Sequence, residues 1–93
     1  MFVGIARIEL HLPSASSLKD KRAVVRSLKE RIRSRVQAAV AEVDHQDLWQ
    51  RAALGVSVVS GTPGPIGEML QSVRKIVESR SDAVVLDWQE QVV

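Results

Sequence analysis

Two periodicities of apolar residues alternate along this chain, and their order restricts the fold more than any other feature. Segments in which apolar and polar residues alternate with a period of two are typical of half-buried strands. They are residues 2–12, 37–44, 50–60 and 82–92. Apolar residues spaced three or four positions apart are typical of amphipathic helices. They occur in residues 18–36 and 65–80. The predicted order is therefore β-α-β-β-α-β.

This order predicts an α+β fold of the ferredoxin-like, split βαβ type. Right-handed crossovers give a four-stranded antiparallel sheet with strand order 4-1-3-2 and both helices on one face. The 93 residues suffice for a single domain with one modest core, so residues 1–93 are predicted to form one ferredoxin-like domain. The residues expected in this core are Val25, Leu28, Ile32, Leu54, Val56, Leu70, Val73 and Leu86.

Local signals refine two of these segments. Ser17 followed by Asp20 has the spacing of a capping box, which predicts the start of the first helix. The alternation in residues 37–44 is imperfect, which indicates a bulge or a position at the edge of the sheet.

The composition excludes several classes of function. The chain has no cysteine, which excludes disulfides, thiolate metal sites and thiol catalysis and fits a reducing, cytoplasmic compartment. No apolar run reaches the roughly 20 residues of a membrane span, so no membrane association is expected. No basic region precedes the first apolar residues, which therefore indicate a strand and not a signal peptide.

Positive charge is concentrated in the first predicted helix. Residues 19–35 contain eight basic and two acidic residues, a net charge of +6, whereas the whole chain carries only +2. Five of the basic residues recur at helical spacing and form one ridge, which Lys21 is expected to join. The candidate nucleic-acid ligands are Lys19, Lys21, Arg22, Arg26, Lys29 and Arg33. Two interpretations remain open: a solvated face whose side chains cover the edge of the core, or a surface that binds a polyanion.

A second candidate site is the predicted turn between the second and third strands. Its chemically versatile side chains are Asp44, His45, Gln46, Asp47, Trp49 and Arg51. The topology would place this turn beside the start of the first helix, near His11. Trp49 is expected to fill the core or the sheet edge more readily than to serve as a stacking platform. Arg51 either pairs with Glu9 or Glu42 across the sheet or faces a ligand.

The same turn contains groups that could form a metal site or a catalytic centre. His11, Asp44, His45 and Asp47 offer imidazole and carboxylate groups, but two histidines from separate segments are a weak signal, and turn capping explains the aspartates. No serine or other nucleophile stands in a recognisable motif. We therefore predict no metal, no cofactor and no enzymatic activity.

The uncovered face of the sheet suggests a third kind of function. It lacks the aromatic residues with which sheet surfaces usually bind RNA. Apolar residues expected there among polar ones are Val3, Ile5, Ala53, Val59 and Val85. A half-apolar, uncovered sheet favours a partner, and we expect a homo-oligomer formed through this face or an edge strand.

Three motifs resemble one family. They are Leu10-His11-Leu12-Pro13, Ser17-Leu18-Lys19-Asp20-Lys21-Arg22 and the segment from Val40 to Gly55. With them the chain resembles, over essentially its whole length, the YlxP-like small bacterial proteins of unknown function. The resemblance implies a single ferredoxin-like domain and transfers no catalytic residues. Genes of that family often lie among transcription and translation factors, which implies an RNA or ribosome partner. The Gly- and Pro-rich segment 61–65 is the main departure.

Two hypotheses of function follow. The first is an RNA- or ribosome-associated accessory factor that binds phosphates through the basic helix. The alternative is a non-enzymatic protein-interaction module that acts as a homo-oligomer.

Overall fold

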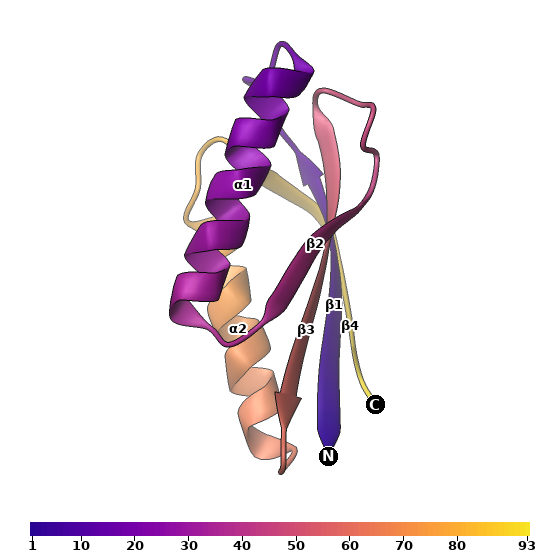
Figure 1. Ribbon diagram of the computed structural model, residues 1–93, viewed down its shortest axis with the longest axis vertical. Coiled ribbons are helices and arrows are strands. Elements are labelled where there is room, and N and C mark those ends of the chain that lie inside the picture. The colour runs from indigo at the N-terminus through magenta and orange to yellow at the C-terminus, as the bar shows by residue number, and fades with distance from the viewer.

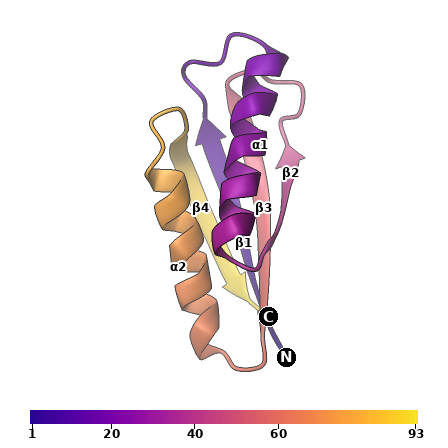
Figure 2. The ribbon, with the colours of Figure 1, turned by 60° about the vertical axis from the view of Figure 1, so that its left-hand side comes forward.

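The computed structural model describes residues 1–93 and confirms the predicted order of elements (Figure 1). The elements are β1 (Phe2–His11), α1 (Leu18–Arg35), β2 (Ala39–Asp44), β3 (Arg51–Ser60), α2 (Gly64–Glu78) and β4 (Val84–Val92). The four strands form one antiparallel sheet in the order β2-β3-β1-β4, which is the predicted order 4-1-3-2 counted from the other edge. Both helices cover the same face of this sheet (Figures 1 and 2).

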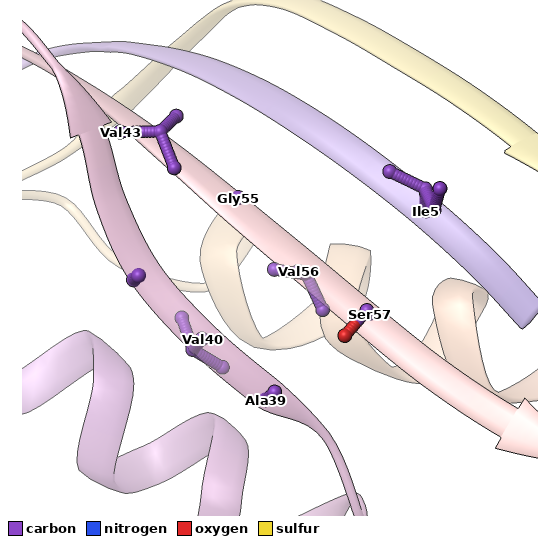
Figure 3. A pocket seen from close by; sticks show the side chains of 8 residues that line it. Ile5, Ala39, Val40, Val43, Gly55, Val56 and Ser57 are labelled. Carbon is purple, nitrogen blue, oxygen red and sulfur yellow. The ribbon is translucent and has the colours of Figure 1, made fainter.

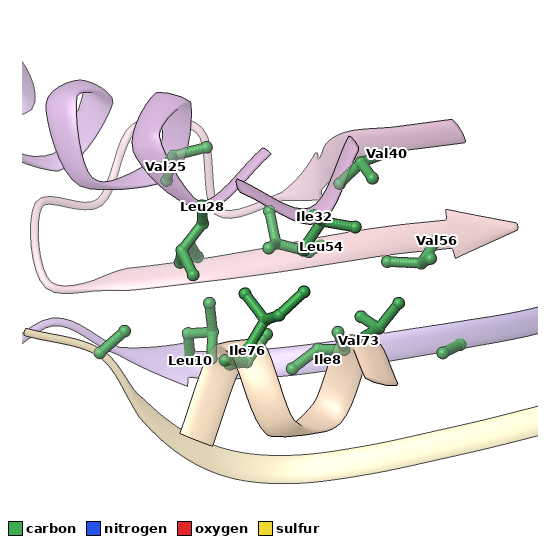
Figure 4. Packing of buried hydrophobic residues seen from close by; sticks show 14 of the residues in the cluster. Ile8, Leu10, Val25, Leu28, Ile32, Val40, Leu54, Val56, Val73 and Ile76 are labelled. Atoms are coloured by element: carbon green, nitrogen blue, oxygen red, sulfur yellow. The ribbon is translucent and has the colours of Figure 1, made fainter. Parts of the chain in front are cut away.

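One hydrophobic core fills the space between the sheet and the helices. Ile8 and Leu10 of β1 and Leu54 of β3 meet the buried stripes of α1 and α2 (Figure 4). Every residue predicted for the core lies there except Leu86. The two periodicities of the sequence therefore correspond to the inward faces of the strands and helices.

Leu86 is the exception because β4 contains an irregularity that reverses its alternation. Leu10 pairs with Val85 and Glu9 pairs with Asp87, so Leu86 has no partner on β1. This bulge turns Val85 and Trp88 toward the core and leaves Leu86 52% exposed. The predictions that Leu86 is a core residue and that Val85 lies on the uncovered face are therefore both wrong.

The local signals in α1 and β2 correspond to real features. The Ser17 hydroxyl accepts a hydrogen bond from the backbone N–H of Asp20 at 3.1 Å, and the Asp20 carboxylate accepts from Ser16. These bonds from Ser16 hold the pKa of Asp20 below its usual value. β2 is an edge strand, and a shift of register between Glu42 and Asp44 leaves Val43 unpaired. Neither helix is long and apolar enough to cross a membrane.

The packing of β1 against α2 depends on the absence of a side chain at Gly4. A Cβ atom at this position would lie 2.6 Å from Cγ2 of Ile66 and 3.0 Å from Cγ2 of Val58. We expect Gly4→Ala to lower the free energy of unfolding by about 1–3 kcal/mol, because it overpacks a filled core. Urea denaturation measures this loss.

Gly67→Ala is the matched control for that prediction. Gly67 lies in α2 and has open space around its missing Cβ. The same change there should raise the free energy of unfolding by about 0.5–1 kcal/mol through helix propensity. Equal effects at the two glycines would contradict the packing argument.

Candidate functional site

Lys21 joins the start of α1 to the end of β2. Its side chain is only 1% exposed, and its Nζ lies 2.8 Å from Oε2 of Glu42 and donates to the backbone carbonyl of His45. The first turns of α1 and the turn between β2 and β3 therefore lie at the same end of the molecule, as the topology predicted (Figures 1 and 2).

The burial of Lys21 corrects the prediction that it joins the basic ridge. Lys21 precedes Val25 by one helical turn and continues the buried stripe of α1 formed by Val25, Leu28 and Ile32. This stripe faces the sheet, where Glu42 neutralises the ammonium group. Lys21 is thus a structural cation and cannot contact a ligand from this position.

His45 shapes the turn after β2. Its φ of 63° is the only positive φ of a non-glycine residue in the protein, a conformation that histidine adopts more readily than most residues. In this conformation its carbonyl accepts hydrogen bonds from Lys21 and from the backbone N–H of Leu48. Its imidazole Nε2 lies 3.0 Å from Oε2 of Glu9 on β1. One strained residue therefore ties the turn to α1 and to the sheet.

Glu9 is the centre of an acid–base network on the uncovered face of the sheet. The network comprises Arg7, Glu9, Asp44, His45 and Arg51. Arg7 donates to Glu9 at 2.8 Å, Arg51 donates to it at 3.0 Å, and Arg7 also reaches Asp44 at 3.2 Å. The pairing of Arg51 with Glu9 was one of the predicted alternatives and is confirmed. Ala53, which pairs with Glu9 and Asp44, lies on this face but is fully buried.

The network also perturbs the acidity of its carboxylates. Partial burial is the largest single influence on Glu9 and raises its pKa. The hydrogen bonds from Arg7, Arg51 and His45 together outweigh it and hold the pKa of Glu9 below its usual value. The backbone N–H of His45, followed by Arg7, lowers the pKa of Asp44. Both groups are therefore anionic near neutral pH, and the two arginines neutralise them.

Three of the four residues that could form a metal site, His11, Asp44 and His45, are engaged in other contacts. The His11 ring lies 3.2 Å from the backbone carbonyl of Gln50, whereas His45 contacts Glu9. No group of three or more His, Cys, Asp or Glu side chains is arranged to hold a metal ion. The side chains of Gln46 and Asp47 are exposed and form no hydrogen bond within the protein.

Trp49 is exposed, so the prediction that it fills the core or the sheet edge is wrong. Its neighbour Gln50 explains why. The Gln50 carbonyl accepts from the backbone N–H of Leu12 at 2.9 Å, and its side chain donates to the carbonyls of Pro13 and Ala15. These bonds fix the chain so that Trp49 is left 53% exposed. A shallow hollow of about 440 Å³ lies here, lined by Asp47, Leu48, Trp49, Gln50 and Arg51.

The basic ridge is exposed along α1. It consists of Lys19, Arg22, Arg26, Lys29 and Arg33, of which only Lys29 is half-buried. None of the five pairs with a carboxylate, and neither do Arg31 and Arg35. Arg33 donates from Nη2 to the carbonyl of Val40 at 2.8 Å, which covers part of the free edge of β2. Seven of the eight cations of α1 therefore have no carboxylate within salt-bridge distance.

An apolar groove of about 350 Å³ lies on the uncovered face, where β2, β3 and β1 run side by side (Figure 3). Val43 packs directly over Gly55, since a Cβ atom there would lie 2.8 Å from Cγ1 of Val43. Ile5 projects from β1 on the far side of β3 and is 42% exposed. The groove is lined by Ile5, Ala39, Val40, Ala41, Val43, Gly55, Val56 and Ser57.

Comparison with known proteins agrees with the resemblance noted in the sequence. The family model described as "Protein of unknown function (DUF503)" matches residues 3–90. The "Uncharacterized protein YlxP" of Bacillus subtilis (strain 168) is 32% identical over 77 residues, which are 83% of this chain and 84% of that protein. The solution NMR structure of a de novo designed protein with a ferredoxin fold covers 100% of this chain and 84% of its own. Its TM-score of 0.57 at 12% identity confirms the fold alone.

The Lys21–Glu42 pair generates a prediction about stability. Lys21→Met would leave Glu42, whose side chain is 18% exposed, without its counter-charge. We expect the free energy of unfolding to fall by about 3 kcal/mol, because removal of one partner strands a largely buried charge. Urea denaturation of the variant measures the loss.

The control is a double-mutant cycle with Glu42→Gln. The double variant Lys21→Met/Glu42→Gln should lose less than the sum of the two single variants, by about 1 kcal/mol or more. Strictly additive losses would mean that the two side chains do not stabilise each other.

Proposed function

This chain belongs to the DUF503 family of proteins of unknown function, and we propose that it is a non-enzymatic RNA-binding accessory protein. In this proposal α1 binds RNA through phosphate contacts, with slight sequence preference. The observation that carries the proposal is the set of seven unpaired cations on α1. Exposed ion pairs stabilise a folded protein by only about 0–1 kcal/mol each, and seven of the eleven acidic residues of this chain already contact other groups.

The distribution of the acidic residues supports the proposal. Residues 19–35 carry +6 and the rest of the chain carries −4, because the total is +2. The face opposite the helices holds Arg7 and Arg51 already neutralised by Glu9 and Asp44. A polyanion would therefore be attracted to α1 and repelled or ignored by the other surfaces.

The geometry of the ridge suits a linear chain of phosphates. Its five cations repeat along the 18 residues of α1, which is about 27 Å long. Contacts of this kind release condensed counterions, so that the logarithm of the affinity falls linearly with the logarithm of the salt concentration. Five contacts to a single strand give a slope of about −3.5.

The absence of catalysis in this proposal has its own support. The side chains best suited to acid–base chemistry are engaged, since His45 contacts Glu9 and His11 contacts the Gln50 carbonyl. The chain has no cysteine to act as a nucleophile.

Self-association is a second candidate function, and the apolar groove is the observation that favours it. The groove exposes Ile5 and Val43 to solvent on a face whose charged groups neutralise one another. A second copy of the chain would meet no net repulsion there, whereas RNA would find no free cation. The edge of β2 is less suitable, because Arg33 already occupies the carbonyl of Val40.

The RNA hypothesis is tested by charge reversal on the ridge. We expect the native chain to bind a short unstructured RNA at low salt, and Arg22→Glu/Arg26→Glu to weaken this binding about tenfold or more, because two phosphate contacts become repulsive. Fluorescence anisotropy of labelled RNA over a salt series measures both the affinity and the slope.

Lys75→Glu serves as the control for ridge position. Lys75 is an exposed cation in the last turn of α2, outside the ridge. Lys75→Glu should lower the affinity for RNA much less than the single change Arg26→Glu does. The hypothesis fails if the native chain binds no RNA at low salt, or if the two single reversals act equally.

The self-association hypothesis is tested by placing a charge in the groove. Ile5→Asp should convert a dimer into a monomer at micromolar concentration, because it would bury an unpaired carboxylate. Analytical ultracentrifugation measures the state of assembly. Leu86→Asp is the matched control, because Leu86 is as apolar as Ile5 and is 52% exposed, against 42% for Ile5, but lies outside the groove. A native chain that sediments only as a monomer contradicts the hypothesis.

A further inference from the structure

Two large apolar side chains are exposed next to each other in the turn between β2 and β3. Leu48 is 49% exposed and Trp49 is 53% exposed. The chain has only one other tryptophan, Trp88, which packs against the core from β4 beneath the guanidinium of Arg74. Exposure of about half of a tryptophan residue to water is unfavourable for the isolated protein, so the exposure of Trp49 needs an explanation.

Flexibility of the turn does not explain the exposure of Trp49, because hydrogen bonds fix the backbone on both sides of this residue. On one side the carbonyl of His45 accepts from the buried ammonium of Lys21 and from the backbone N–H of Leu48. On the other side Gln50 bonds the backbone of Leu12 and the carbonyl of Pro13. The indole thus projects from a fixed frame and loses little backbone freedom when a ligand contacts it.

The hollow at Trp49 has the chemistry of a nucleobase site. Its volume is about 440 Å³, and Trp49 and Leu48 line it together with three polar residues. Arg51 donates to Glu9 through Nη2 and its Nε is buried, so only its Nη1 is a free donor group, and the Asp47 side chain accepts no hydrogen bond from the protein. An aromatic face beside free donors and acceptors fits a flat heterocycle that carries both.

The hollow lies at the same end of the molecule as the first ridge cations of α1 (Figures 1 and 2). Lys19 and Arg22 flank Lys21 in the first turns of α1, and Lys21 contacts the turn directly. A chain whose phosphates lie along α1 can therefore place a base at Trp49. The bases of a duplex are stacked on one another and cannot leave the helix without a loss of stacking, whereas an unpaired base can.

We propose that Trp49 is a stacking platform for an unpaired nucleobase, so that the protein prefers single-stranded to double-stranded RNA. This inference rests on the proposed function of α1 and adds to it the class of RNA. The ridge supplies affinity for any phosphate chain, and Trp49 supplies the preference for a chain with free bases.

Tryptophan fluorescence tests the inference directly, because the two tryptophans can be observed separately. Trp88→Phe leaves Trp49 as the only reporter, and Trp49→Phe leaves Trp88. A short oligoadenylate should quench the first variant and not the second. An RNA duplex of the same length should bind without quenching either variant. Circular dichroism of both variants establishes that they are folded.

The affinities of Trp49→Ala give a second readout. Loss of one stacked base should weaken binding of the oligoadenylate about 5- to 100-fold, while the affinity for the duplex stays within about twofold because phosphate contacts on α1 are unchanged. Leu86→Ala is the control for removal of an exposed apolar side chain elsewhere, and should change neither affinity.

The outcomes separate this inference from the function on which it rests. If both RNAs bind with a steep salt dependence but Trp49 is not quenched and Trp49→Ala binds normally, the stacking platform is wrong and the ridge stands. If neither RNA binds at low salt, the proposed function fails as well. If Trp49→Ala abolishes retention of a protein partner while binding of oligoadenylate is unchanged, a protein surface occupies the hollow and the inference is overturned.

Discussion

The buried ammonium group of Lys21 is the interaction on which this end of the molecule depends. A cation taken out of water must be paired and hydrogen-bonded, and here Glu42 and the carbonyl of His45 supply what it needs. Both partners are contributed by the end of β2, so α1 cannot pack on the sheet without fixing the direction in which the chain leaves that strand. The left-handed backbone of His45 then directs its imidazole to Glu9 and closes the acid–base network.

The surface of this small domain has two regions of different charge, the neutralised uncovered face and the positively charged α1. On the uncovered face, the carboxylate of Glu9 contacts Arg7, Arg51 and His45. Arg7 also donates a hydrogen bond to the carboxylate of Asp44. On α1 the ridge cations have no such partners. Arg7 and Arg51 on the uncovered face are both paired with carboxylates, whereas the arginines of α1 form no salt bridge. The positive charge of α1 therefore does not result from a general shortage of acidic residues in the chain.

The fold could be predicted from the sequence because each element carries its own periodicity. The burial of three residues, however, was predicted wrongly. Leu86 was misplaced because a bulge in β4 depends on its pairing with β1 and leaves no mark in the alternation of β4 alone. Trp49 was misplaced because its exposure follows from the hydrogen bonds of Gln50 to a distant loop. Lys21 is different: its spacing from Val25 places it on the buried stripe of α1, although lysine is almost never fully buried unless it is paired. The contact of Arg51 with Glu9 was one of three alternatives that the sequence left open, whereas the contacts of Arg7 and His45 with Glu9 were not predicted.

The two candidate surfaces occupy opposite sides of the sheet, and this placement allows them to act together. α1 lies on the covered face and the apolar groove on the other (Figures 1 and 3). A dimer formed through the groove would keep both ridges free, because α1 lies on the covered face. Two weak sites on one particle bind a long RNA far more tightly than one site does, because the second contact is intramolecular. Residues that never touch RNA, such as Ile5, would then contribute to the affinity through assembly alone. The affinity for a short oligonucleotide that contacts only one ridge would not depend on these residues.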